Sequence, residues 1–147
     1  MYIFDIDGTL ADCTHRLHHI IGDNKDWDAF DAEGQKDTPI GKVIEICNAL
    51  YDKGWDIMLL TGRNERVRVC TEKWLATYGV QYDRLLMRGL GDRREDTIVK
   101  KELLDAFLLE EDLGPKQIES IFEDRQRLVD MFRAEGYHVC QVAKGDF

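Results

Sequence analysis

The chain begins with Met1-Tyr2-Ile3-Phe4-Asp5-Ile6-Asp7-Gly8-Thr9, an apolar run that ends in two aspartates and a turn-forming Gly-Thr pair. Side chains of an extended chain alternate between two faces, so Asp5 and Asp7 are expected to point to one side at the tip of a buried strand. Two carboxylates held together repel each other unless they share a proton or a divalent cation. The stretch therefore indicates metal-assisted phosphoryl transfer, and the alternative is an acidic strand-to-turn junction without chemistry.

The length of 147 residues suits one domain with a substantial core. Hydrophobic residues make up 44% of the chain and only two prolines occur, so we expect neither disorder nor a proline-rich linker. No apolar run approaches the roughly 18 residues of a membrane-spanning helix. We therefore expect a single domain over residues 1–147, in a cytoplasmic protein without membrane contact.

The formal net charge of −9 argues against a general attraction to nucleic acid. The charge is uneven, because residues 1–60 carry 5 basic and 12 acidic side chains, whereas residues 61–101 carry 10 basic and 6 acidic ones. A basic segment of this kind can hold an anionic substrate locally. The alternative is that most of its cations cover solvated helix faces.

Apolar runs of strand length alternate with segments of helical periodicity. The expected strands lie at residues 1–5, 55–60, 84–87, 118–122 and 137–142. The expected helices lie at residues 40–53, 64–78, 96–111 and 125–135. This alternation predicts parallel strands between helical layers, an α/β fold.

An insert at about residues 10–39 separates the first strand from the first long helix. Loops of this length in compact domains are usually functional or disordered, and the aromatic residues of this one argue against disorder. We expect a small helical flap over the site, with Trp27 and Phe30 packing it down. Stacking of a nucleic-acid base on either ring is the alternative.

Polar residues follow the first four expected strands, and in an open parallel sheet reactive groups collect at these carboxyl ends. In chain order they are Asp5 and Asp7, Thr61-Gly62-Arg63, Asp96 with Lys100, and Glu123-Asp124. Each later group alone has an ordinary explanation, such as an ion pair four residues apart on a helix or an acidic helix start. Together they bring acid, hydroxyl, cation and acid to one edge of the sheet, which favours phosphoryl transfer.

These groups resemble the four motifs of the haloacid dehalogenase superfamily, which match Asp5-Ile6-Asp7-Gly8-Thr9, Thr61, Lys100 and Glu123-Asp124. The resemblance spans the whole chain. It implies a Rossmann-like three-layer sandwich with a five-stranded parallel sheet, a central first strand and a minimal cap. It also implies phosphoryl transfer through an aspartyl-phosphate, which divides a difficult displacement into two easier steps.

The same resemblance implies a role for each catalytic residue. Asp5 is the expected nucleophile, and Asp7 is the acid that protonates the leaving alkoxide and later activates water. Thr61 and Lys100 are expected to bind the phosphoryl oxygens, where charge must be stabilised.

Mg²⁺ is the cofactor that the resemblance implies. Its expected ligands are Asp5, Asp124 and the backbone carbonyl of Asp7. Glu123 stands where the relatives usually have an aspartate, so its part in metal binding is open. Its longer side chain is expected either to reach the metal through water or to orient Asp124.

Further stretches resemble the phosphatase domain of phage-type polynucleotide kinase/phosphatase, namely Arg16, Thr61-Gly62-Arg63, residues 91–100 and residues 141–147. This resemblance implies removal of 3′-phosphates from nucleic-acid ends. It adds Arg16, Gly62, Arg63 and Asp96 to the substrate site. The two arginines are expected to contact phosphate, and Asp96 to orient Lys100 or an arginine.

Three functions follow as hypotheses. The first is a Mg²⁺-dependent 3′-phosphatase acting on DNA or RNA ends. The second is a phosphatase of the same chemistry that acts on mononucleotides or other small phosphate esters, and the third is a non-catalytic binding module that retains the fold. Because the net charge opposes tight duplex binding, we expect recognition of the terminal nucleotide and a shallow salt dependence.

Overall fold

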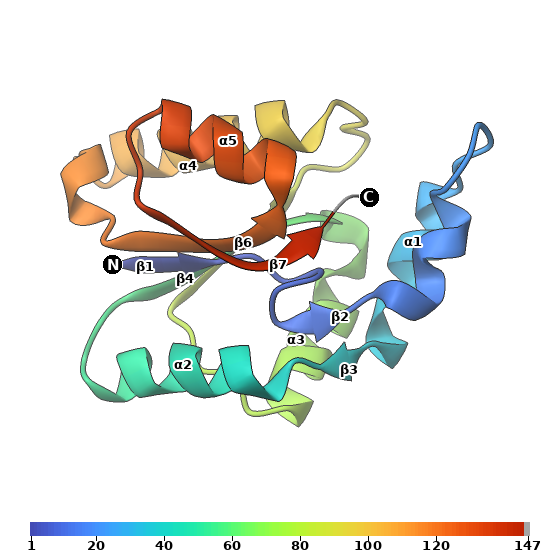
Figure 1. The fold of residues 1–147 in the computed structure, drawn as a ribbon, viewed down its shortest axis with the longest axis horizontal. Helices are drawn as coiled ribbons and strands as arrows, with labels where there is room; N and C mark the ends of the chain where they lie inside the picture. Colours follow the sequence, from blue (N-terminus) through green and yellow to red (C-terminus); the bar gives the residue numbers. More distant parts are fainter. Residues whose placement is uncertain (146–147) are drawn as a thin grey trace.

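The computed structural model describes residues 1–145, so Asp146 and Phe147, the end of one matching stretch, lie outside it. A five-stranded parallel sheet forms its centre, in the order β5-β4-β1-β6-β7 (Figure 1). The strands are β1 (Tyr2–Phe4), β4 (Ile57–Asn64), β5 (Arg84–Arg88), β6 (Ser120–Arg125) and β7 (Val139–Gly145). The expected α/β fold with a central first strand is confirmed.

Helices cover both faces of the sheet (Figure 1). One face carries α4 (Asp96–Glu110) and α5 (Gln126–Ala134), and the other carries α2 (Gly41–Asp52) and α3 (Arg68–Thr77). The 3₁₀ turns η3 (Glu65–Val67) and η4 (Pro115–Gln117) lie in the connections. The expected helix at 64–78 thus starts as a 3₁₀ turn and becomes α-helical at Arg68.

Alternation along the strands explains the three layers. In β1, Ile3 packs into the core beneath α4 and α5, whereas the next residue, Phe4, packs into the core beneath α2 and α3. In β4, Met58 and Leu60 take the first side and Leu59 takes the second. Central strands are therefore apolar on both faces, and each fully buried side chain of this kind contributes about 1.5–3 kcal/mol.

The strands β4 and β6 extend further than the sequence predicted, and β7 likewise runs to Gly145 instead of ending at residue 142. The expected strands 55–60 and 118–122 become Ile57–Asn64 and Ser120–Arg125, so the polar groups that were expected after these strands lie within them. The pairing is irregular there, with register shifts between Thr61 and Asn64 and between Glu123 and Arg125. Such irregularities bend a strand and re-aim its side chains, here at the carboxyl edge of the sheet.

The insert at residues 10–39 forms the expected flap, but it is not only helical. Its base is an antiparallel pair, β2 (Ala11–Asp12) with β3 (Thr38–Pro39). Between these strands lie the 3₁₀ helix η1 (Thr14–His19), the helix α1 (Trp27–Glu33) and the 3₁₀ turn η2 (Gly34–Lys36). Figure 1 shows α1 beyond the carboxyl ends of the strands.

The two aromatic residues of the flap lie in different environments. Phe30 is 3% exposed and packs with Cys13 and Ile20, as predicted. Trp27 is 43% exposed, so the prediction that it packs the flap down is wrong. Both residues belong to one seven-residue helix, and Phe30 occupies its buried side while the Trp27 ring meets the Phe30 ring edge-on.

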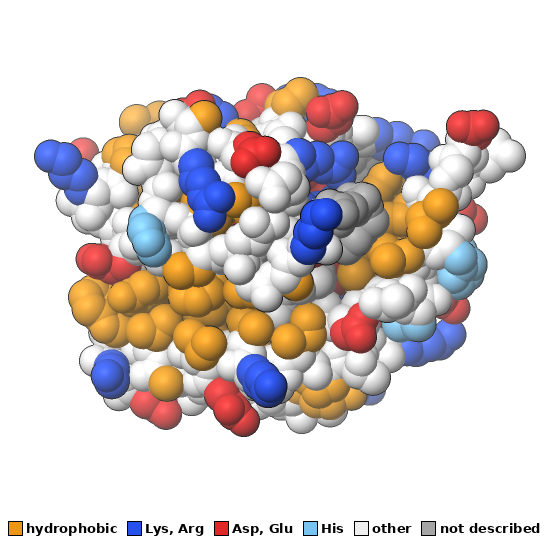
Figure 2. Space-filling model, in the orientation of Figure 1, with side chains coloured by type: hydrophobic (Ala, Val, Ile, Leu, Met, Phe, Trp, Pro, Cys, Tyr) orange, Lys and Arg blue, Asp and Glu red, His pale blue; other side chains and the backbone are white. Residues whose placement is uncertain are grey.

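Figure 2 shows charged side chains scattered over one face of the molecule. A band of hydrophobic side chains lies between α2 and the edge strand β7, and charged side chains border it (Figure 2). None of the helices between residues 1 and 145 combines the length and the hydropathy that crossing a membrane requires.

Candidate active site

Four chemically active side chains meet at the carboxyl ends of β1 and β6. Asp5 directly follows β1, and Glu123 and Asp124 lie in β6. Lys100 reaches the same point from the second turn of α4. All four residues are at most 4% exposed. The fold thus brings together acidic and basic residues from three of the four groups that the sequence singled out.

Lys100 links Asp5 to Glu123. Its ammonium group donates to Asp5 Oδ1 at 2.6 Å and to Glu123 Oε2 at 2.8 Å. The other oxygen of Glu123 accepts the backbone N–H groups of Asp124 at 3.1 Å and Arg125 at 3.2 Å. Burial would lower the pKa of Lys100, but Asp5 and Glu123 outweigh burial and hold this pKa above its usual range. Lys100 is therefore a stable cation beside Asp5.

Asp124 has a buried oxygen that lacks a hydrogen bond. Its Oδ1 has no partner among the residues that the structure describes. Burial, followed by the neighbouring Glu123, raises the pKa of Asp124 to about 7. Buried polar atoms are almost always satisfied in native proteins, so an orphaned carboxylate oxygen indicates a missing partner.

Two glycines make room for the Asp124 carboxylate. A Cβ at Gly8 would lie 2.2 Å from Asp124 Oδ2, and a Cβ at Gly145 would lie 2.0 Å from the same atom. Gly8 also has a φ of +89°, which L side chains rarely adopt. The turn after Asp7 and the end of β7 therefore close on this carboxylate together.

Asp5, Glu123 and Asp124 have the chemistry of a divalent cation site. One oxygen of each lies within 4.8 Å of the other two. Burial, followed by Glu123, raises the pKa of Asp5 well above its usual range, so this cluster lacks positive charge even beside Lys100. Hard cations such as Mg²⁺ take carboxylate oxygens as ligands and relieve their repulsion. The orphaned oxygen of Asp124 and this donor set both fit such an ion.

Asp7 belongs to an adjoining network with two arginines. Arg16 of the flap donates to Asp7 Oδ1 at 2.5 Å, and Arg63 of β4 donates to the same oxygen at 2.6 Å. Burial would raise the pKa of Asp7, but Arg63 and Arg16 outweigh it and hold this pKa well below its usual range. Asp7 is therefore ionised, and it joins the flap to the sheet.

Asp37 completes this network, although no sequence signal indicated it. It is fully buried, accepts two hydrogen bonds from Arg16 at 2.8 and 2.6 Å, and accepts one from Arg63 at 2.6 Å. His15 contacts the same carboxylate at 2.8 Å. Asp37 is one of 12 acidic residues among the first 60, and nothing in its neighbours distinguishes it.

Asp96 bridges two further arginines. It forms short ion pairs with Arg88 at the end of β5 and with Arg125 at the end of β6. Burial would raise the pKa of Asp96, but Arg125, Lys100 and Arg88 outweigh it and lower this pKa. A Cβ at Gly62 would lie 2.8 Å from Asp96 Oδ1, so a glycine is required where β4 approaches the start of α4. Among the described residues, Asp96 forms hydrogen bonds with these arginines and not with Lys100.

Thr61 is fully buried where β4 becomes irregular. Its hydroxyl accepts the backbone N–H of Arg63 at 3.2 Å, which helps to fix the strand end. Gly62 and Arg63 line the pocket at the site, whereas Thr61 is absent from its lining within residues 1–145.

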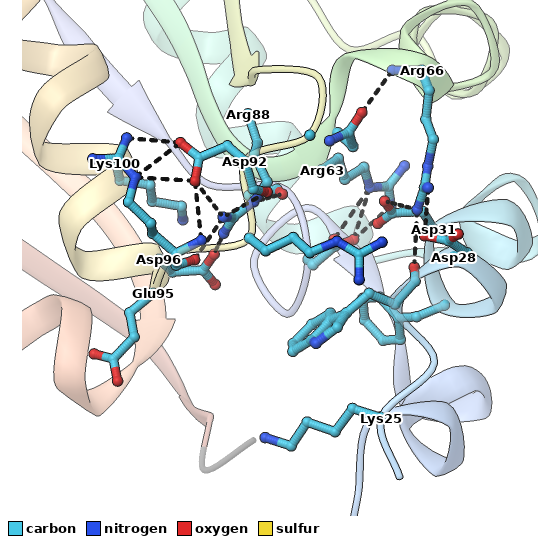
Figure 3. Close-up of a pocket in the computed structure, with 18 of the residues that line it drawn as sticks. Lys25, Asp28, Asp31, Arg63, Arg66, Arg88, Asp92, Glu95, Asp96 and Lys100 are labelled. Atoms are coloured by element: carbon cyan, nitrogen blue, oxygen red, sulfur yellow. Dashed lines mark hydrogen bonds and ion pairs between the residues drawn. The ribbon is translucent and has the colours of Figure 1, made fainter.

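Asp5 and Lys100 line a pocket of about 1050 Å³. Figure 3 shows Lys100 among the residues that line it. The flap forms one wall and the loop at residues 89–95 forms part of the opposite wall. Arg66 fastens the flap to the rest of the protein, because it pairs with Asp28 and donates to Asp31 at 3.0 Å (Figure 3). Small-molecule sites usually have volumes of about 300–1,000 Å³, so this pocket exceeds the needs of one phosphoryl group.

The buried networks around this pocket are nearly balanced in charge. Six carboxylates belong to them: Asp5, Asp7, Asp37, Asp96, Glu123 and Asp124. Five cations face these carboxylates: Arg16, Arg63, Arg88, Lys100 and Arg125. A bound divalent cation would reverse the sign of this excess and favour an anionic ligand.

Residues 1–147 match the family model for the polynucleotide kinase PNKP phosphatase domain. Among solved structures, a chain of the Pnkp1/Rnl/Hen1 RNA repair complex is 35% identical with a TM-score of 0.82, covering 99% of this chain and 43% of that one. A haloacid dehalogenase-like hydrolase from Streptococcus pneumoniae shares the fold, with a TM-score of 0.67 at 13% identity over 95% of this chain and 82% of that one.

Among curated proteins, acid phosphatase 1 of Solanum lycopersicum is 28% identical over 117 residues. The match covers 75% of this chain and 46% of the relative. The chain therefore spans less than half the length of this relative and of the repair-complex chain.

Proposed function

Because the chain belongs to the family of PNKP phosphatase domains, within the haloacid dehalogenase superfamily of phosphatases, we propose that it removes 3′-phosphates from polynucleotide ends with the help of Mg²⁺. The observation that carries this proposal is the orphaned oxygen of Asp124 beside the buried pair of Asp5 and Lys100. Asp5, the proposed nucleophile, and the cation Lys100 line the pocket, and Asp124, a proposed metal ligand, lies beside Asp5.

In the proposed reaction, a carboxylate oxygen of Asp5 attacks phosphorus and the bond from phosphorus to the 3′ oxygen breaks. Water then hydrolyses the aspartyl-phosphate, which restores the Asp5 carboxylate and releases inorganic phosphate. The Lys100 ammonium already lies 2.6 Å from Asp5 Oδ1. It can therefore stabilise charge on the phosphoryl oxygens without a rearrangement of its side chain. Thr61 is proposed to assist from the end of β4.

Asp7 is ionised in the free protein, so it first takes up a proton from the monoanionic form of the bound phosphate ester, then passes that proton to the leaving 3′ oxygen, and later removes one from the attacking water. The incoming phosphate gives Arg16 and Arg63 a second acceptor, which weakens their hold on Asp7 and lets it take part in proton transfer. Asp37 keeps both arginines in place during this exchange, because it binds each of them independently of Asp7.

Mg²⁺, when bound, would screen Asp5 from the phosphate and stabilise charge on the phosphoryl oxygens. Asp5, Asp124 and the backbone carbonyl of Asp7 are the proposed ligands. Both oxygens of Glu123 are already engaged, one by Lys100 and one by two backbone N–H groups. We therefore assign Glu123 to orienting Lys100 and the Asp124 backbone, with metal contact through water at most.

Polynucleotide ends are favoured as substrates by two observations. The most similar chain described above belongs to an RNA repair complex, and the pocket is larger than a phosphoryl group requires. Comparing kcat/KM for a 3′-phosphorylated oligonucleotide with kcat/KM for 3′- and 5′-mononucleotides tests the proposal. We expect a preference for the oligonucleotide, and a preference for mononucleotides would overturn the assignment.

The second candidate is a phosphatase of small phosphate esters. The likeness to acid phosphatase 1 favours this candidate. Asp5 and Lys100 would act in the same way on any phosphomonoester. The comparison above separates the two candidates, since a small-ester enzyme would gain nothing from a longer substrate.

A further inference from the structure

Most cations that line the pocket already have carboxylate partners. Arg66 pairs with Asp28 and Asp31, Arg94 pairs with Asp92 and Glu102, and Arg88 and Arg125 share Asp96. A cation whose charge is matched by a nearby carboxylate attracts a further anion weakly. These arginines therefore shape the walls of the pocket more than they attract ligand.

Three cations of the lining differ from this group. Lys25, Arg93 and Arg127 are exposed, and their side chains form no hydrogen bond or ion pair within the described residues. They come from three separate elements, namely the flap, the loop at residues 89–95 and the first turn of α5. Figure 3 shows Lys25 extending from the flap with no dashed contact drawn to it.

The loop that carries Arg93 is held in place although Arg93 itself is not. Arg88 donates to the backbone oxygen of Arg94 at 2.7 Å, and Asn64 donates to that of Gly89 at 3.0 Å. Asp92 accepts the backbone N–H of Arg94 at 3.0 Å. The loop therefore presents an unmatched charge from a fixed backbone, which suits a ligand phosphate.

Trp27 adds a flat apolar surface to the same pocket. Its ring is 43% exposed, lines the pocket and lies 5.9 Å from the ammonium of Lys25. Proteins that bind single-stranded nucleic acid combine such a ring, on which a base stacks, with cations that follow the backbone.

Resting on the proposed function, we propose that this pocket binds the last few nucleotides of a single-stranded polynucleotide. The terminal 3′-phosphate lies at Asp5, a base stacks on Trp27, and Arg93 and Arg127 contact the preceding backbone phosphates. Lys25 adds a third contact beside Trp27. Three cations without a hydrogen bond or ion pair among the described residues, on a chain of net charge −9, suit a few backbone phosphates but not the many contacts of tight duplex binding.

The test uses three substrates: a 3′-phosphorylated single-stranded 10-mer, the same strand in a blunt duplex, and p-nitrophenyl phosphate. The quantity to compare is the ratio of kcat/KM for the 10-mer to kcat/KM for p-nitrophenyl phosphate. Trp27→Ala should lower this ratio about 5- to 150-fold, because base stacking is worth roughly 1–3 kcal/mol. Trp27→Phe should restore most of the loss, since phenylalanine keeps a ring in the pocket.

The double variant Arg93→Gln/Arg127→Gln should also lower the ratio, mainly through KM for the 10-mer. The slope of log kcat/KM against log salt should become shallower by about 0.7 for each lost contact to a single strand. Trp55→Ala is the matched aromatic control, because Trp55 is 41% exposed and lies outside the pocket lining. Lys73→Gln/Lys116→Gln is the matched charge control, on exposed cations away from the pocket.

The following results would contradict the inference, and the last of them would also contradict the proposed function. A ratio that stays within twofold of the wild type in both pocket variants, or a control variant that lowers it equally, would overturn the inference alone. A blunt duplex that is hydrolysed better than the single strand would also overturn it. Wild-type enzyme that hydrolyses p-nitrophenyl phosphate but not the 10-mer would overturn the proposed function and the inference together.

Discussion

Lys100 Nζ lies 2.6 Å from Asp5 Oδ1, and both residues are buried. The cation stabilises the ionised form of Asp5, which burial and Glu123 oppose. In the proposed reaction the same cation then faces the charge that develops on the phosphoryl group. In that reaction, one ion pair would therefore favour the ionised form of the nucleophile and also stabilise the charge that its attack creates.

Asp5→Asn should abolish phosphatase turnover and leave the fold intact. The amide has almost the same volume as the carboxylate but cannot act as the nucleophile. Steady-state hydrolysis of p-nitrophenyl phosphate measures the loss, and circular dichroism measures the fold. Wild-type turnover in this variant would rule out the covalent route.

Lys100→Ala should lower kcat by about 10² or more, the scale of a lost oxyanion donor. Lys101→Ala is the matched control, because the neighbouring Lys101 is a partly exposed residue that pairs with Asp105 at the surface. Both variants are compared by kcat and KM under the same conditions. A Lys100 variant that changes KM alone would contradict the assigned role.

Asp37→Asn should lower the free energy of unfolding by about 3–5 kcal/mol, as expected when one partner of a buried ion pair is removed. Asp37 is fully buried and holds Arg16 and Arg63 together. Urea denaturation measures the change. Asp105→Asn, which breaks an exposed pair with Lys101, serves as control and should cost under about 1 kcal/mol. Equal losses in the two variants would disprove the structural role of Asp37.

Asp96→Asn should destabilise the protein in a pH-dependent way. The pKa of Asp96 is lowered in the folded state, so its charge stabilises the fold above the unfolded pKa of about 3.9. That contribution is lost as the pH falls through the lowered folded pKa. The gap in unfolding free energy between wild type and Asp96→Asn should thus be full at pH 6 and shrink below about pH 4. A gap that widens on acidification would contradict the ion-pair assignment.

Gly145→Ala should weaken metal binding without unfolding the protein. Its new Cβ would lie 2.0 Å from Asp124 Oδ2 and would displace that carboxylate. For the wild type, Mg²⁺ at 100 times its Kd should add about 2.7 kcal/mol of stability, measurable as a rise in Tm. That rise should be reduced in Gly145→Ala and kept in Gly41→Ala, because nothing lies within 4 Å of a Cβ at Gly41. An unchanged rise in Gly145→Ala would contradict the metal site.

Much of this architecture could be predicted because its signals are local. The alternation in β1 and the apolar run of β4 set the layers, and Asp5 directly follows a strand that the sequence identifies. Parallel pairing then brings Asp5 and Asp124 to one edge whatever the details of the loops.

The arginine networks could not be predicted, because each depends on distant partners. Arg16 and Asp37 are 21 positions apart, and Asp7 and Arg63 are 56 positions apart. Arg88 belongs to the basic segment at residues 61–101, and Arg125 begins the expected helix at residues 125–135. Only the fold, however, places Asp96 between these two arginines. The exposure of Trp27 likewise depends on which side of the short helix α1 meets the core, and the amino-acid composition of the flap does not indicate that side.

A Cβ at Gly8 and a Cβ at Gly145 would meet the same oxygen of Asp124, although the two glycines are far apart in the sequence. During translation the first strand and its turn leave the ribosome long before β7 does. The wall that β7 supplies is then absent, and Asp124 faces water on that side. Catalytic competence should therefore arise only after β7 has been synthesised and has joined the edge of the sheet.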